Sequence, residues 1–298
     1  MKKLLAVFLA LVLLAPMASA ARKKYYTPRL VLETGHSYSQ QCVADLNMKT
    51  SYLGTHSTFR ERVIADITFT VQRVGDTTSW LEVRYDSLAY SSWSNDGIVV
   101  ASSEKKDNNL CLLLKKLSNK SFTVVLSHRG VPTDVIGLKE LVKWVASTPG
   151  TTEDEKAILD SFEKKMIENL FAGLYPKTSV AVSEPKPVGD FFGYADYMPT
   201  LSNIQYTLKS AGRERYDITM AGSTDIEYID EINNSFAEYC IEVSDNIRQD
   251  RSTGWTLSQN LAMKNKGVMV SEGMALPLEM MMQIKVTSKD NKTTYVEN

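Results

Sequence analysis

The feature of this sequence that most constrains its fold is a two-residue alternation of apolar and polar side chains, which recurs in both halves of the chain. Successive side chains of a β-strand point to opposite faces of a sheet, so this period is typical of strands with one apolar and one solvated face. In the first half the apolar positions are Val63, Ala65, Ile67, Phe69 and Val71, then Leu81, Val83 and Tyr85, then Phe122, Val124 and Leu126. In the second half they are Ile204, Tyr206 and Leu208, then Tyr216, Ile218 and Met220, then Trp255, Leu257, Leu261 and Met263, and finally Met280, Met282, Ile284 and Val286. The pattern predicts two runs of half-buried strands.

Turn-forming residues separate these strands, at Gly75-Asp76, Ala211-Gly212, Ala221-Gly222, Thr253-Gly254 and Gly267. Strands that follow one another through short turns pair antiparallel. Each such sheet has one apolar face, which another layer must cover. The sequence therefore predicts antiparallel meanders and requires a covering layer.

Three amphipathic helices between the two runs can supply that layer. Apolar residues recur there at helical spacing: Leu110, Leu113, Leu114 and Leu117; then Leu138, Leu141, Val142 and Val145; then Ile158, Leu159, Phe162, Met166, Leu170 and Leu174. Thr152 and Glu155 predict a capping box at the start of the third helix, which Tyr175-Pro176 ends. All three helices have a polar face, so none of them is expected to span a membrane.

These elements predict an α+β fold in which antiparallel meander sheets flank and wrap about three central helices, with a half-barrel as one form of this arrangement. We expect a signal peptide at residues 1–20 and a single domain at 21–298. Strands occupy 30–128, helices 107–174 are partly interleaved with them, and strands return at 190–288. Ser183–Pro187 is the one proline-rich break, and we expect an ordered crossover there rather than a hinge.

The first twenty residues have the pattern of a secretory signal peptide. Lys2 and Lys3 precede an apolar run from Leu4 to Ala15, and Ala18-Ser19-Ala20 supplies the small residues that a signal peptidase requires. The run is shorter than the roughly 20 residues that a membrane span needs. No cysteine follows to carry a lipid. We therefore expect cleavage after Ala20 and a periplasmic or extracellular protein that is neither membrane-spanning nor a lipoprotein.

The charge balance excludes one class of partner. The chain has 34 basic and 35 acidic residues, which are interspersed. A nucleic-acid-binding protein needs a basic stripe, and none is visible. We expect no nucleic acid as a partner, and the sequence leaves the oligomeric state open.

Cys42, Cys111 and Cys240 are too few for a disulfide framework. Cys42 is in phase with Ala44, Leu46 and Met48 on the expected buried face of a strand. Cys111 lies in the first helix, and Cys240 is in phase with Glu238 and Glu242 on the more polar face of a strand. We favour separate buried thiols, with a single disulfide as the alternative.

No catalytic pattern stands out. The three histidines, His36, His56 and His128, have no metal-site spacing, and neither a nucleophile elbow nor a phosphate-binding loop is present. The carboxylates Asp225, Glu227, Asp230 and Glu231 alternate with Ile226, Tyr228 and Ile229, as in an exposed strand. We therefore assign no catalytic residue, metal or cofactor.

Methionine is concentrated in the last forty residues, at Met263, Met269, Met274, Met280, Met281 and Met282. Thioethers fill ordinary cores, line adaptable apolar cavities and bind soft copper ions. The spacings do not repeat as metal motifs do, so core and cavity are the favoured interpretations. The residues predicted to line an apolar cavity are Phe162, Met166, Leu170, Trp255, Met263, Met280 and Met282.

Several short motifs, taken in order, resemble an uncharacterised family of exported bacterial proteins, domain of unknown function 6263. They are Gly35-x-x-Tyr38, Val83-Arg-Tyr-Asp-Ser87, Lys120-Ser-Phe-Thr123, Gly130, Val135-Ile-Gly137, Tyr175-Pro176, Gly189-Asp190 and Asp250-x-x-Thr253-Gly254-Trp255. The chain departs from the family at Phe191-Phe192, where a tryptophan is usual, and in the acidic segment from Asp225 to Asn246. The resemblance implies a secreted β-rich envelope protein and supplies no catalytic residues.

A looser resemblance, at the level of the fold, is to the periplasmic half-barrel carriers of lipoproteins, and a fold alone does not assign a function. Together these observations favour a non-catalytic protein that binds or carries an apolar or lipidated ligand. The alternatives are a structural or cell-surface interaction protein without a cavity and, third, a hydrolase of unrecognised type.

Overall fold

The computed structural model describes residues 23–52, 55–95, 97–118, 120–127, 129–160, 175–187, 203–230, 235–271, 274–289 and 294–295. Within these residues the fold is mostly β, with three short helices. The strands are β1 (Tyr25–Tyr26), β2 (His36–Tyr52), β3 (Thr55–Val74), β4 (Thr78–Ser94), β5 (Gly97–Ser102), β6 (Ser121–Ser127), β7 (Pro132–Ile136), β8 (Val180–Ala181), β9 (Pro185–Pro187), β10 (Gln205–Ala211), β11 (Arg215–Asp230), β12 (Ser235–Asp250), β13 (Thr256–Ser271), β14 (Met274–Ser288) and β15 (Thr294–Tyr295). The helices are α2 (Asn109–Leu117), α3 (Leu138–Ala146) and α4 (Glu153–Asp160).

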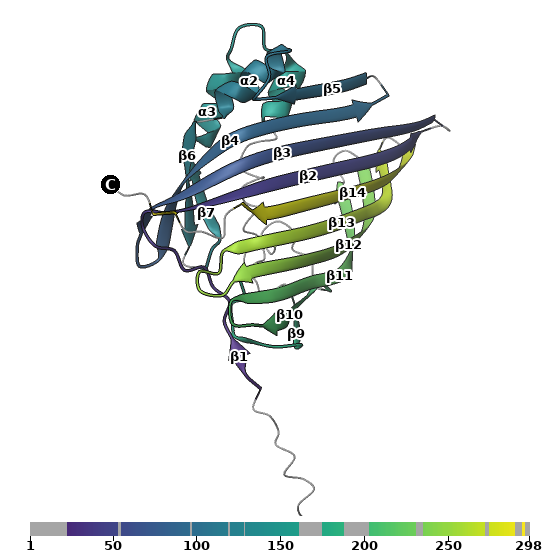
Figure 1. Cartoon of the computed structure of the whole chain (residues 1–298). Coiled ribbons are helices and arrows are strands. Elements are labelled where there is room, and N and C mark those ends of the chain that lie inside the picture. The colour runs from purple at the N-terminus through teal and green to yellow at the C-terminus, as the bar shows by residue number, and fades with distance from the viewer. Residues whose placement is uncertain are drawn as a thin grey trace, which may run out of the picture.

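One large antiparallel sheet dominates the fold. It has 13 strands, and its main path runs β7-β6-β4-β3-β2-β14-β13-β12-β11-β10-β9, with β5 beside β4 and β15 beside β2. The outer strands of this path, β7 and β9, do not pair with each other, so the sheet is not closed. Figure 1 shows β6 and β7 toward one end of the sheet and β9 and β10 at the other.

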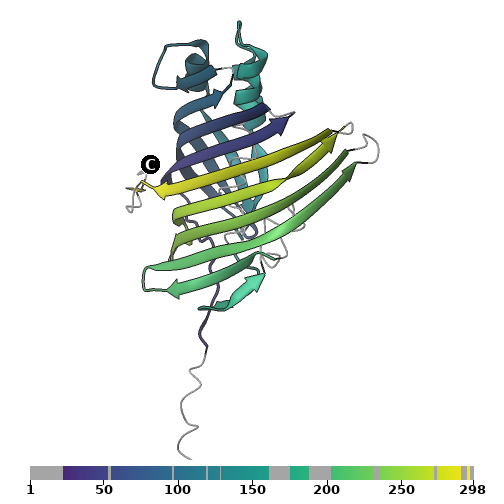
Figure 2. The same ribbon diagram turned by 90° about the vertical axis from the view of Figure 1, so that its right-hand side faces the viewer.

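The two predicted runs of strands form one sheet because β2 pairs with β14. This seam joins the first and the last long strands of the chain, in register from Gln40↔Ser288 to Thr50↔Leu278. Figure 2 shows β14 to β11 continuing the sheet beyond β2. The prediction of separate sheets on either side of the helices was wrong, because alternation within a strand does not reveal which distant strand it pairs with.

The long strands have two distinct faces. On β3 the side chains of Ala65, Ile67 and Phe69 are almost fully buried, and we call the face they share the core face. Asp66 and Thr68 alternate with them and lie on the opposite face, which we call the outer face. The outer face is mostly polar and partly exposed, as the alternation predicted.

The helices lie at one end of the sheet, where α2 contacts β4 and β5 and α3 contacts β6 (Figure 1). Helix α2 buries Leu113, Leu114 and Leu117 completely. The prediction of three amphipathic helices is confirmed for these segments, but they do not lie at the centre between two sheets. The stripe from Phe162 to Leu174 lies outside the described residues.

Two predicted turns are wrong because the strands continue through them. Ala221 and Gly222 lie within β11, and Gly267 lies within β13, where it pairs with Tyr239 and Leu278. A Cβ atom on Gly222 would collide with the backbone of Asn203. Glycine at 222 therefore permits a close approach of the segment before β10 rather than a change of chain direction.

The cysteines are separate thiols, as favoured. Cys42 and Cys111 are buried, as predicted. Cys240 is exposed on the outer face of β12, which agrees with its predicted place on the polar face and contradicts only the general expectation of buried thiols. Its phase with Glu242, which is exposed on the same face, explains the difference.

Candidate functional site

The predicted cavity residues divide into three groups. Trp255 and Met263 are buried in the packed core. Met280 and Met282 lie on the core face of β14 and are only partly buried. Phe162, Met166 and Leu170 lie outside the described residues. The structure thus brings the two methionines of β14 beside Met263, which pairs with Met282, and leaves Trp255 in another part of the core.

Met280 and Met282 belong to a wider apolar strip on the core face. One cross-strand row runs from Phe59 through Met48 to Met280. The next row runs from Leu46 through Met282 to Met263. Five of these side chains share partial exposure and form what we call the core-face strip: Leu46, Met48, Phe59, Met280 and Met282.

Polar groups border the core-face strip. Glu61 pairs with Leu46 on the core face, and burial raises the pKa of its carboxyl. Asn265 pairs with Met280, and its buried Oδ1 atom has no hydrogen-bond partner within the described part of the chain. A ligand that entered the strip would therefore meet thioethers and a phenyl ring, with a protonatable carboxyl and an amide at the border.

Several of the family-like motifs meet at one junction. The ring of Trp255 stacks on Tyr38, with centroids 4.2 Å apart, and packs edge-on against Phe69 at 5.2 Å. The Tyr175 hydroxyl donates to the carbonyl of Gly254 at 3.2 Å. The Tyr175 ring also lies against Gly130, where a Cβ atom would approach it to 2.5 Å. These motif residues hold parts of the chain together and carry no reactive geometry.

The motif residue Asp250 organises the turn between β12 and β13. Its Oδ1 atom accepts hydrogen bonds from the backbone N–H groups of Ser252 at 2.9 Å and Thr253 at 2.8 Å, and from both hydroxyls. Partial burial opposes ionisation, but these bonds outweigh it and lower the pKa of Asp250. Its role is that of an Asx turn, which explains the Asp-x-x-Thr-Gly pattern.

One ionisable group, Asp245, is buried among apolar neighbours on the core face of β12. Its side chain is 1% exposed, and its cross-strand neighbours are Met220 and Leu261. Gln259 donates to Oδ2 at 2.8 Å. Burial raises the pKa of Asp245 to about 6, although its hydrogen bonds oppose the shift. No nucleophile or second carboxylate contacts it within the described residues.

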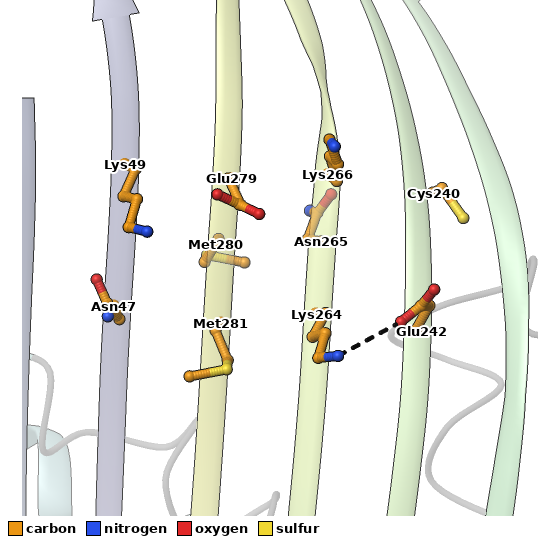
Figure 3. A pocket seen from close by; sticks show the side chains of 10 residues that line it. All are labelled: Asn47, Lys49, Cys240, Glu242, Lys264, Asn265, Lys266, Glu279, Met280 and Met281. Atoms are coloured by element: carbon orange, nitrogen blue, oxygen red, sulfur yellow. Dashed lines mark ion pairs between the residues drawn. The ribbon is translucent and has the colours of Figure 1, made fainter. Parts of the chain in front are cut away.

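The outer face carries open hollows, one of which is shown in Figure 3. It has a volume of about 410 Å³ and is lined by Asn47, Lys49, Cys240, Glu242, Lys264, Asn265, Lys266, Glu279, Met280 and Met281. Lys264 pairs with Glu242 at 3.9 Å (Figure 3). Met280 is its only residue from the predicted cavity set, so this hollow is not the predicted cavity.

Metal-binding groups of three or more His, Cys, Asp or Glu side chains do not occur within the described ranges. His36 is buried and lies 3.3 Å from Glu33, whereas His56 is exposed. Asp225 is exposed on β11, and the side chains of the other three clustered carboxylates lie outside the described set. Among the described helices, none is long and apolar enough to cross a membrane.

The sequence prediction missed three members of the core-face strip. Leu46 and Met48 were predicted only to share the buried face of Cys42, and Phe59 was not among the predicted residues. Phe59 is in phase with Val63, four residues later, so the alternation contained its position. The sequence could not reveal that β2, β3 and β14 lie side by side.

Comparisons with known proteins give a family and distant structural likenesses. A model described as Family of unknown function (DUF6263) matches residues 76–256. No curated protein sequence matches the chain. A solved structure described as lipid–protein interactions in lipovitellin is similar with a TM-score of 0.44 and 8% identity, covering 89% of this chain. The chain spans only 26% of the lipovitellin chain.

Two structures of proteins from Pseudomonas species are more weakly similar. One is an outer membrane channel from Pseudomonas putida F1, with a TM-score of 0.25 and 7% identity over 87% of this chain and 97% of that chain. The other is OccK7 (OpdD) from Pseudomonas aeruginosa, with a TM-score of 0.24 and 5% identity over 85% and 99%. Similarity at these scores supports no inference about function.

Proposed function

The chain belongs to the family of unknown function DUF6263, and from the geometry of its sheet we propose that it is an exported, non-catalytic protein that binds an apolar or lipidated ligand. In this proposal the open, curved sheet acts as a half-barrel, and the core-face strip is its binding surface. The signal-like residues 1–20 support export, although they lie outside the described part of the chain.

The observation that carries the proposal is the change in burial along the core face. In the packed part, Ala65, Cys42 and Val286 form one cross-strand row and are at most 2% exposed. Three rows further along the same face, Phe59, Met48 and Met280 are partly exposed. The apolar face thus continues beyond its fully packed part.

The composition of the core-face strip suits a variable apolar ligand. Methionine has a flexible, polarisable side chain that adapts to irregular shapes. Contiguous exposed apolar surface also disfavours the free protein, because water contacts it. Contact with an acyl chain would remove that surface from water without requiring a catalytic group.

A second candidate is a structural or interaction protein without a ligand cavity. It is favoured by the junction of Tyr38, Gly130, Tyr175, Gly254 and Trp255, in which the motif residues that resemble the family have structural roles. The two candidates differ in one property, which is the binding of apolar molecules by the folded protein.

The test measures binding of an environment-sensitive apolar dye to the purified protein, followed by competition with fatty acid. We expect saturable binding that fatty acid reverses. Met280→Lys and Met282→Lys should each weaken dye binding by about tenfold or more, because burying an unpaired ammonium group against an acyl chain is strongly unfavourable.

Met281→Lys is the matched control. Met281 lies between the other two on the same strand but on the outer face, and it is 36% exposed. This variant should bind dye like the wild type, and circular dichroism must show that all three variants are folded. Equal dye binding by all four proteins, or no binding by the wild type, would favour the interaction protein without a cavity.

A further inference from the structure

A second hollow lies on the outer face, on the opposite side of the sheet from the core-face strip. It has a volume of about 650 Å³ and is lined by residues of β10 to β14. Its lining contains four cationic side chains and a single carboxylate, Asp217. The cations are Lys209, Arg215, Arg248 and Lys285. This excess of positive charge is local, because the whole chain has a formal net charge of −1.

The single carboxylate, that of Asp217, already pairs with two cationic side chains. Asp217 lies 3.3 Å from Arg215 and 3.5 Å from Arg248, and it accepts a hydrogen bond from the Ser210 hydroxyl at 2.6 Å. Lys209 and Lys285 are exposed and have no ion-pair partner within the described ranges. One carboxylate therefore serves two guanidinium groups, and two ammonium groups remain available to an anion.

Neutral hydrogen-bonding groups lie between the cations. One cross-strand row runs from Thr219 through Asn246 and Asn260 to Lys285. The neighbouring row carries Ser258 and Thr287 beside Arg248. Adjacent strands are about 4.8 Å apart, so amide and hydroxyl groups recur at that interval across the hollow.

Apolar side chains contribute little to this surface. Three apolar residues line the hollow, but Ile218, Ile247 and Val286 are at most 2% exposed because their side chains point to the core face. A site for a lipid bilayer would expose apolar side chains beside its cations. The lining instead combines cations with hydroxyl and amide groups.

We propose that this hollow binds an acidic saccharide chain. Carboxylate groups on the saccharide pair with Lys209, Lys285 and the two arginines, whose guanidinium groups bind carboxylates well. The sugar hydroxyls exchange hydrogen bonds with Asn246, Asn260 and the neighbouring hydroxyl groups. The site is independent of the apolar ligand proposed for the other face.

The experiment uses the purified protein with polygalacturonate as the acidic probe and dextran as the neutral one, in isothermal titration calorimetry. Polygalacturonate should bind and dextran should not. Binding should weaken strongly in about 0.5 M sodium chloride, because salt screens exposed charges. The double variant Lys209→Gln/Lys285→Gln should weaken binding by about tenfold or more, since hydrogen bonds between charged groups are lost.

The matched control is Lys49→Gln/Lys266→Gln. Both lysines are exposed on the same outer face, and they line the other hollow (Figure 3), where Glu242 and Glu279 also lie. The control changes the net charge by the same amount and should retain wild-type affinity within about twofold. Equal losses in the two double variants would overturn the proposal, because they would show a general charge effect. Binding to phosphatidylglycerol vesicles without binding to polygalacturonate would overturn it too, in favour of a membrane surface.

Discussion

Gly35 and Gly254 both have a positive φ, but only Gly254 also lacks room for a Cβ atom. Gly35 has φ +86° with no atom near its missing Cβ, whereas Gly254 has φ +72° and its Cβ would collide with the carbonyl oxygen of Arg29. Left-handed backbone costs a non-glycine residue about 1–2 kcal/mol, so Gly35→Ala should lose that amount of stability. Gly254→Ala should lose about 3 kcal/mol or more, because the turn and Arg29 must also move apart.

Chemical denaturation of the two glycine variants measures this difference. The unfolding midpoint should fall further for Gly254→Ala than for Gly35→Ala. Equal midpoints would show that Arg29 does not pack against the turn in solution.

A second residue-scale prediction concerns Asp245. Burial raises the pKa of its carboxyl from 3.8 to about 6. Between these two pH values the folded protein holds a proton that the unfolded chain releases. The contribution of this group to stability is therefore favourable at low pH and is lost as the pH rises toward 6, by about 3 kcal/mol at most. Asp245→Asn should remove this loss.

The free energy of unfolding of wild type and Asp245→Asn, measured at pH 4 and pH 7, isolates the effect. The variant should gain stability relative to wild type on going from pH 4 to pH 7. A relative stability that does not change with pH would mean that Asp245 is not buried as described.

At the scale of elements, the start of α4 offers a direct test. The backbone N–H of Glu155 donates to the Thr152 hydroxyl at 3.2 Å, and the N–H of Thr152 donates to the Glu155 carboxylate at 2.9 Å. These bonds confirm the predicted capping box. Thr152→Ala should lower the free energy of unfolding by about 0.5–2 kcal/mol without changing the fold, as equilibrium denaturation would show. Thr152→Ser, which keeps the capping hydroxyl, is the control and should unfold like the wild type.

The sequence predicted element type better than element length. Alternation on β3 identified the strand around Ile67, because period two is a local property. It did not predict that β11 continues through Ala221 and Gly222, because turn propensity there is overridden by pairing with β12 along its whole length. Local signals cannot report the pairing that decides such cases.

The same limit applies to the candidate site: a local pattern places a residue on one face of a strand but does not say what packs against it. Met280 and Met282 were correctly placed on an apolar face by their phase with Ile284. Trp255 was assigned to a cavity, but it stacks on Tyr38 in the packed core. Its stacking partner lies more than two hundred residues earlier, so no local pattern could have separated these roles.

At the scale of the whole molecule, residues 1–20 remain a prediction of export. The Ala18-Ser19-Ala20 pattern predicts cleavage after Ala20. N-terminal sequencing of protein recovered outside the cytoplasm should begin at Ala21. A mature chain that retained the apolar run, or that began beyond Tyr26, would contradict this prediction.

The seam between β2 and β14 has a consequence for the order in which the molecule can assemble. Thr50 pairs with Leu278, so a ribosome must finish almost the entire chain before the middle of the sheet can form. Until then the edge of β2 exposes unpaired backbone groups that can pair with another nascent chain. High contact order also predicts slow folding. The seam therefore leaves any incomplete chain with an open strand edge in the middle of its future sheet, until β14 is available to cover it.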